Sequence, residues 1–139
     1  MGAPYYGAYV ATALMAGGKH ITALDPGSTN YAAYASFDAN GAPLRVLLYN
    51  SNYYTSGSRS SESFTLTGLT ATTVKAKRLT APSATSRSDQ GDTITFGGQS
   101  FADVTCQIGG TESFETATVS GGQVTFSVKA TEALLVYLQ

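Results

Sequence analysis

Hydrophobic and polar residues alternate along most of this chain in short runs that turn-forming residues separate. After Thr93, pairs of glycines at 97–98, 109–110 and 121–122 divide such runs. Paired glycines between alternating runs predict tight β-hairpins, because the turns that match strand twist need positive φ. About ten short strands with turns between them predict an antiparallel β-sandwich, and their irregular spacing argues against a solenoid or propeller. Before the glycine pairs, strands are expected at 19–24, 31–37, 44–49, 62–67 and 72–79.

The first segment has a different period. Pro4 suits the first turn of a helix, and Tyr6, Val10 and Leu14 then recur at helical spacing until a pair of glycines ends the pattern. We expect one short helix over residues 4–16, with a broad aromatic and apolar face that needs something to pack on. The predicted fold class is therefore all-β, an antiparallel β-sandwich with one short N-terminal helix.

Composition narrows the class of protein. The 139 residues suffice for one domain, and 42% are hydrophobic. Only 12% are charged, about half the usual ~25%, and a polar but uncharged surface is common in secreted β-proteins. The net charge of -1 gives no electrostatic reason to expect binding to nucleic acid or to an anionic membrane. No run is long and apolar enough to span a bilayer, and no signal peptide is recognisable.

The acidic residues do not form an obvious catalytic pair. A retaining glycosidase needs two carboxylates about 5 Å apart, and the candidate pair, Glu112 and Glu115, lies beside a glycine turn. Strand alternation would place these two on opposite faces, so we expect solvated turn carboxylates. A Ser-His-Asp triad would have to use His20, but the chain has no G-x-S-x-G elbow. No catalytic residue is predicted.

Metal and cofactor sites are not expected either. With one histidine, His20, and one cysteine, Cys106, the chain cannot build His-rich or zinc-thiolate sites. The Asp-Ala-Asn-Gly segment at 38–41 lacks the later acidic ligands of a calcium loop. Cys106 lies in the run VTCQI, where we expect a strand with this residue as a small buried hydrophobe.

Two pairs of residues are candidates for contact with a ligand or partner. Lys75 and Lys77 share one face of the expected strand, which is either simply hydrated or contacts an acidic glycan or a partner domain. Tyr53 and Tyr54 lie in the polar loop 50–61. Loop packing or an interdomain contact is the first interpretation, and stacking on sugar rings is the alternative. The absence of tryptophan weakens the sugar interpretation.

Several segments in order resemble the C-terminal β-domain of glycoside hydrolase family 79, which includes β-glucuronidases and heparanase-like enzymes. The matching segments are PYYGAYVATALMAG, YAAYASFDANGAPLRVLLYNSNYY, TTVKAKRLTAP, ITFGGQSF and ATEALLVYL, from about Pro4 to Leu138. The resemblance implies a sandwich appended to a (β/α)8 catalytic barrel in extracellular enzymes that act on glucuronide-containing glycans. It implies that residues 1–18 are the helical remnant of the barrel-to-sandwich connection and that 19–139 form the sandwich domain.

The resemblance also implies that catalysis takes place on the barrel, where the family's acid lies within an Asn-Glu pair. No such pair occurs in this chain. The first hypothesis is a non-catalytic domain that supports a barrel. The second is a free-standing carbohydrate-binding module that uses Tyr53, Tyr54, Lys75 and Lys77. The third is a self-associating domain, a homodimer that covers the apolar face of the helix.

Overall fold

The computed structural model describes residues 3–27 and 29–139. That part contains one α-helix, one 3-10 helix and eleven strands. In chain order they are α1 (Ala3–Met15), β1 (His20–Ala23), β2 (Tyr31–Phe37), β3 (Pro43–Asn50), β4 (Ser61–Leu66), β5 (Thr73–Thr80), η1 (Ser88–Gln90), β6 (Thr95–Phe96), β7 (Ser100–Phe101), β8 (Ile108–Gly109), β9 (Glu115–Thr118), β10 (Val124–Lys129) and β11 (Glu132–Tyr137).

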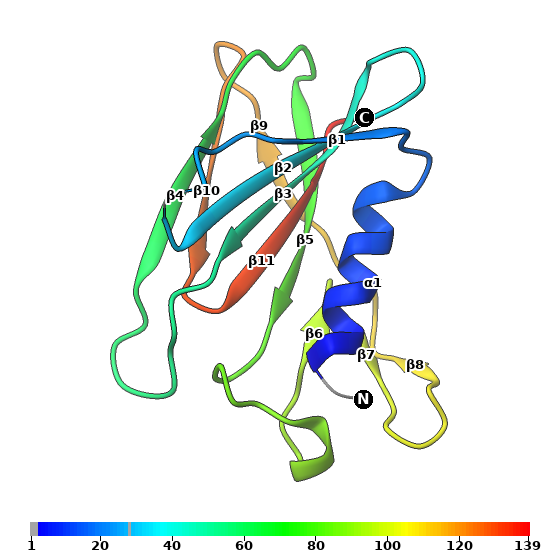
Figure 1. The fold of residues 1–139 in the computed structure, drawn as a ribbon, viewed down its shortest axis with the longest axis vertical. Helices are drawn as coiled ribbons and strands as arrows, with labels where there is room; N and C mark the ends of the chain where they lie inside the picture. The colour runs from blue at the N-terminus through cyan, green and yellow to red at the C-terminus, as the bar shows by residue number, and fades with distance from the viewer. Residues whose placement is uncertain (1–2, 28) are drawn as a thin grey trace.

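Two antiparallel layers form the sandwich (Figure 1). The large sheet has the order β1-β2-β3-β11-β5-β6, and β9 also pairs with β5. The small facing sheet consists of β4 and β10, while β7 and β8 form a separate short ladder. The final strand, β11, therefore lies in the middle of the large sheet, between β3 and β5. The predicted fold class is confirmed.

The core fills the space between the two sheets. Strand alternation explains its composition, because every second side chain of β3, β5, β10 and β11 points inward. The buried side chains of this cluster include Val46, Leu48, Val128, Leu134 and Val136. Along β11 the residues from Glu132 to Val136 are all buried, because the other side of this strand lies under the helix.

Helix α1 packs on the outer face of the large sheet, the face that points away from β4 and β10 (Figure 1). Its Val10 and Leu14 are each 3% exposed and form a second apolar cluster with Phe96 and Leu135. The helix predicted at 4–16 is confirmed. The apolar face that was expected to need something to pack on is covered within the chain, where Val10 and Leu14 pack against Phe96 and Leu135.

Two polar contacts fix the ends of the helix. Near its start, the backbone N–H of Phe101 donates to the hydroxyl oxygen of Tyr6 over 3.0 Å. After its end, Arg45 donates to the carbonyl oxygen of Ala16 over 2.5 Å, where a cation complements the helix dipole. These contacts hold α1 across the sheet in one position.

The glycine pairs at 97–98 and 121–122 form tight turns, but the hairpins predicted around them are wrong. Gly97, Gly98, Gly121 and Gly122 all have positive φ, and each pair is flanked by an isolated antiparallel bridge. The strands on either side then separate: β6 pairs with β5 and β7 with β8, while β9 pairs with β5 and β10 with β4. The glycines determine where the chain reverses direction. The sheet in which each strand is buried determines which strand it pairs with.

Cys106 is exposed and does not lie in a strand, contrary to expectation. It has a φ of 57° in the loop between β7 and β8. Two backbone hydrogen bonds close this loop, one from Cys106 to Ala102 and one from Ala102 to Gln107. The neighbouring Val104 is 94% exposed. The apolar residues at the start of this run therefore lie at the tip of a loop and do not reach the core.

Candidate functional site

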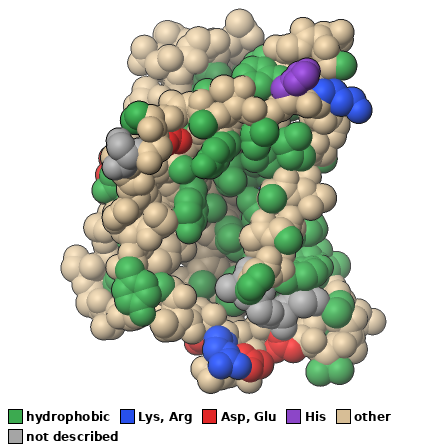
Figure 2. Space-filling view, in the orientation of Figure 1, with side chains coloured by type: hydrophobic (Ala, Val, Ile, Leu, Met, Phe, Trp, Pro, Cys, Tyr) green, Lys and Arg blue, Asp and Glu red, His purple; other side chains and the backbone are tan. Residues whose placement is uncertain are grey.

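A groove with a volume of about 490 Å³ lies beside α1 on the outer face of the large sheet. We call it the outer groove. Helix residues Tyr6 and Val10 line one side, and Leu47 and Tyr49 of β3 form its floor. The other side comes from Tyr53 and from the segment that follows β5. Figure 2 shows hydrophobic side chains gathered over the middle of this face. The groove is thus a largely apolar hollow, and the serine and threonine residues that line it are Ser51, Thr80, Ser83, Ser86 and Thr131.

The two candidate tyrosines have different environments. Tyr53 is 74% exposed and lines the outer groove. Tyr54 lies under the guanidinium of Arg59, 5.0 Å from the ring centroid, and its hydroxyl donates to the carbonyl oxygen of Gly57. Its own carbonyl accepts a hydrogen bond from Ala84. Tyr54 therefore holds the loop together, and Tyr53 is the one whose ring is available for contact.

Arg59 anchors the loop that carries these tyrosines. Its guanidinium donates to the carbonyl oxygens of Ala130 over 2.8 Å and Ala81 over 3.1 Å. It also donates to the hydroxyl of Thr131 over 2.9 Å. One side chain thus ties the tyrosine loop to the β10–β11 turn and to the segment after β5. This part of the groove wall is preorganised by these bonds.

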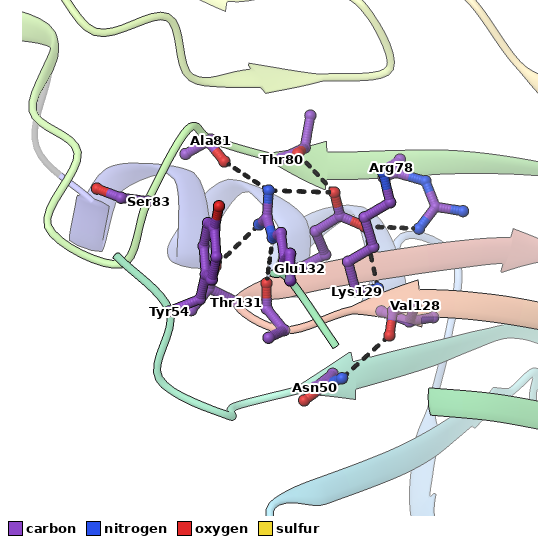
Figure 3. Close-up of polar contacts among 12 residues, drawn as sticks. Asn50, Tyr54, Arg78, Thr80, Ala81, Ser83, Val128, Lys129, Thr131 and Glu132 are labelled. Carbon is purple, nitrogen blue, oxygen red and sulfur yellow. Dashed lines mark hydrogen bonds and ion pairs between the residues drawn. The ribbon is translucent and has the colours of Figure 1, made fainter. Parts of the chain in front are cut away.

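The buried residue Glu132 links the end of β5 to the β10–β11 turn in the same part of the structure. The residue is only 4% exposed. Its carboxylate accepts hydrogen bonds from Thr80 over 2.7 Å and from Arg78 over 2.9 Å (Figure 3). The backbone N–H of Lys129 donates to it as well. Burial opposes ionisation, but the bond from Thr80 and the charge of Arg78 outweigh it and hold the pKa of Glu132 below its usual range.

The two candidate lysines also differ. Lys77 is only 8% exposed; it forms an ion pair with Glu112 and lies over the rings of Phe96 and Phe114. The prediction of a hydrated face is wrong for this residue. Lys75 is exposed, with its ammonium group 5.8 Å from the centroid of the Phe114 ring. Only Lys75 presents much of its surface to solvent.

Glu112 and Glu115, expected as solvated turn carboxylates, are both bound to cations of β5. Glu112 pairs with Lys77, and Glu115 accepts two hydrogen bonds from the guanidinium of Arg78, at 2.6 and 2.9 Å. The expectation missed these contacts because the partners are more than thirty positions away in the sequence. Glu112 holds the segment before β9 against β5, and Glu115 holds the start of β9 there.

The structure does not bring the tyrosines and lysines together into one site. The tyrosine loop is fixed near Thr80 and Ala81, at the end of β5. Lys75 lies five positions earlier on that strand, about 17 Å away at ~3.3 Å per residue. The four candidates therefore form two separate surfaces.

Sequence reasoning missed three residues that shape the groove. Alternation in the run LRVLLYN could have placed Tyr49 on the outer face, where it is 43% exposed. In the final run of the chain, alternation places Glu132 on the same face as Leu134, which predicts a buried carboxylate. No sequence signal marks Arg59.

Residues 3–27 and 29–139 hold no group of three or more His, Cys, Asp and Glu side chains placed to bind a metal ion. His20 is exposed at the start of the edge strand β1. Nor is any helix in those ranges long and apolar enough to span a bilayer.

Comparison with known proteins identifies the family. Residues 31–135 match the model of the glycosyl hydrolase family 79 C-terminal beta domain. A solved crystal structure, that of a 4-O-α-L-rhamnosyl-β-D-glucuronidase from Fusarium oxysporum 12S in complex with Rha-GlcA, is 56% identical, with a TM-score of 0.96. The match covers 99% of this chain and 30% of that one. A comparison with curated proteins found no match. The chain belongs to the family of glycoside hydrolase family 79 C-terminal β-domains.

Proposed function

We propose that this chain is a non-catalytic accessory domain that supports the (β/α)8 catalytic barrel of an extracellular enzyme acting on glucuronide-containing glycans. The observation that carries the proposal is the partial match to the solved glucuronidase, of which this domain corresponds to 30%. Most of that enzyme lies outside the matched region. A fold match at 56% identity supports the proposal that the parent of this chain also has a separate catalytic part beside this domain.

The contacts of the carboxylates support the same proposal. Glu132 is bound by Arg78 and Thr80, and Glu112 and Glu115 are each bound to a cation of β5. General acid catalysis on a glycosidic bond needs a carboxylic acid that reaches the substrate, with its partner carboxylate across the bond. These three carboxylates hold strands and loops in place instead.

The proposal is tested with an aryl β-glucuronide assay of the isolated chain and of the full-length parent protein. We expect turnover by the full-length protein and none by the isolated chain, because the acid and nucleophile lie on the barrel. Circular dichroism first shows that the isolated chain is folded. Turnover by the pure, folded chain would overturn the proposal.

Glycan binding is a second candidate, favoured by the 74% exposure of Tyr53 beside groove hydroxyls. An aromatic ring next to hydroxyl donors suits the apolar face and the hydroxyls of a sugar. Calorimetry with acidic oligosaccharides tests it, with the variants Tyr53→Ala, Lys75→Ala and Lys77→Ala. We expect Tyr53→Ala to remove the heat of binding. Tyr54→Ala reports on loop order, since Tyr54 packs under Arg59. Absence of heat with every oligosaccharide would rule against this candidate.

A further inference from the structure

The short ladder of β7 and β8 carries an exposed loop, residues 102–107, that lies outside both sheets of the sandwich. Two backbone hydrogen bonds of 2.9 Å close this loop at its base. A third bond ties it to η1, where the hydroxyl of Ser88 donates to the carboxylate of Asp103 over 2.6 Å. These bonds hold the loop in one conformation, so the side chains at its surface have fixed positions.

The backbone around the loop is closely packed and locally strained. A Cβ added at Gly110 would lie 2.5 Å from the carbonyl oxygen of Gly98, and one added at Gly98 would lie 2.6 Å from that of Thr111. Within the loop, Cys106 has a φ of 57°, which residues other than glycine rarely adopt. Backbone conformations of this kind cluster at functional sites, where a fixed geometry is needed.

The outward side chains of the loop contribute little to the fold. Val104 is 94% exposed, and Ile108, where the loop joins β8, is 51% exposed. An apolar side chain that stays in water gains no burial energy for the domain. Thr105 and Gln107 lie between these two and are exposed as well. The loop therefore presents aliphatic groups beside a hydroxyl and an amide, a combination that suits the apolar faces and the hydroxyls of sugars.

The loop lies at the end of the molecule where α1 begins (Figure 1). The backbone N–H of Phe101, just before the loop, donates to the hydroxyl of Tyr6 over 3.0 Å, and the ring of Phe101 is 4.9 Å from that of Tyr5. The β2–β3 turn lies at the opposite end, where the N–H of Lys19, after the helix, donates to the carbonyl oxygen of Phe37. The direction of α1 thus distinguishes the two ends of the domain.

We propose that loop 102–107 borders the substrate cleft of the parent enzyme and contacts the part of the glycan beyond the glucuronate at which it is cut. Val104 and Gln107 then help to determine which glycans the enzyme accepts. The inference rests on the proposed function and goes beyond it, since it gives this domain a part in substrate selection as well as in support.

The direction of α1 connects the loop to the cleft. In a (β/α)8 barrel each strand is followed by a helix that runs back along it, and the active site lies at the C-terminal ends of the strands. Each barrel helix therefore begins at the active-site end. The helix α1 precedes residues 31–135, which match the C-terminal domain, yet it lies within the match to the solved glucuronidase. It takes the place of the final barrel helix, so its start, with the loop beside it, lies on the active-site side.

The test compares Val104→Asp with the matched control Ala39→Asp in the full-length parent protein. Ala39 is exposed in the β2–β3 turn, so the control adds the same charge at the opposite end of the domain. The substrates are an aryl β-glucuronide and a polysaccharide whose side chains end in β-linked glucuronate. We expect Val104→Asp to lower kcat/KM for the polysaccharide by roughly fivefold or more, because an apolar contact is lost and a like charge faces the glycan.

The aryl β-glucuronide separates substrate selection from catalysis. We expect Val104→Asp to change its kcat/KM by less than about twofold, because this substrate lacks the rest of the glycan. With the polysaccharide the loss should be found in KM, since a contact away from the reacting bond binds substrate and transition state alike. Gln107→Ala, whose backbone still closes the loop, should raise the same KM roughly twofold to tenfold through one lost hydrogen bond. Ala39→Asp should leave both substrates unaffected.

Three results would overturn the inference. The first is an equal kcat/KM of Val104→Asp and Ala39→Asp on the polysaccharide. The second is an equal loss of Val104→Asp on both substrates, and the third is a shortened half-life of its activity at elevated temperature; either would assign the loop a structural role. Absence of glucuronidase activity in the unaltered full-length protein would instead refute the proposed function, and this inference with it.

Discussion

At the scale of single residues, Arg78 binds two carboxylates that differ in burial. Its contact with Glu132 is 2.9 Å and its contact with Glu115 is 2.6 Å, yet the side chains are 5% and 44% exposed. Removing one partner of a buried ion pair leaves a charge without compensation, whereas an exposed pair contributes little. Burial, and not the length of the contact, should therefore decide the energetic role of each carboxylate.

Glu132→Gln should lower the free energy of unfolding by about 2–4 kcal/mol, because Arg78 and Thr80 lose a charged acceptor. The matched variant Glu115→Gln should lower it by less than about 1 kcal/mol. Urea unfolding followed by circular dichroism measures both. Equal effects of the two variants would show that burial does not control this network.

The lowered pKa of Glu132 makes the stability of the fold depend on pH. It is lowered in the folded state, so the carboxylate stabilises the fold above its unfolded pKa, near 4.5, and this contribution is lost as pH falls through the folded pKa. The wild-type urea midpoint should fall between pH 6 and pH 3. Glu132→Gln, which has no proton to bind there, should show a shallower fall. A parallel decline in the two proteins would exclude Glu132 as the titrating group.

At the scale of elements, two glycine turns of similar φ have different surroundings. A Cβ added at Gly98 would lie 2.6 Å from the carbonyl oxygen of Thr111, whereas one added at Gly121 meets nothing within 4 Å. Both glycines have positive φ, which costs an alanine about 1–2 kcal/mol. Only the turn at Gly98 is pressed against another segment.

Gly98→Ala should therefore destabilise the domain by roughly 2 kcal/mol more than Gly121→Ala, since the overlap adds to the strain of the turn. Thermal unfolding of the two variants under the same conditions measures the difference. Indistinguishable melting temperatures would mean that the segment around Thr111 shifts without cost.

The sequence pattern predicted α1 and the positions of β2, β3, β4 and β5 because each has a clear local period. Pairing could not be read in this way, since the strands beside a glycine turn enter different sheets according to where their apolar faces are buried. The environment of Lys77 was missed for a related reason: Glu112 is 35 positions away. The apolar run around Cys106 has the composition of a strand but folds as a loop tip.

At the scale of the molecule, α1 and the sandwich share one apolar cluster. The expected division into a helical remnant at 1–18 and a domain at 19–139 would cut through that cluster, since Val10 and Leu14 contact Phe96 and Leu135. Full burial of two such side chains contributes about 3–6 kcal/mol. The helix therefore stabilises the sandwich.

A shortened chain that starts at Lys19 should have a clearly lower urea midpoint than the whole chain and should bind a hydrophobic dye, because Phe96 and Leu135 become exposed. Dye fluorescence and urea unfolding measure the two effects. A fragment as stable as the whole chain would show that residues 1–18 form a separate unit after all.

The position of β11 sets an order on folding. This strand forms the ladder on both of its sides, with β3 and with β5, although it is the final strand of the described chain. Until β11 pairs, β3 and β5 are each unpaired on one side. The entropy lost in closing the long loops between these strands is then not offset by the hydrogen bonds and burial that β11 provides. During synthesis the large sheet therefore stays open until residues 132–137 have left the ribosome. The large sheet is thus completed at its middle by the last of its strands in chain order.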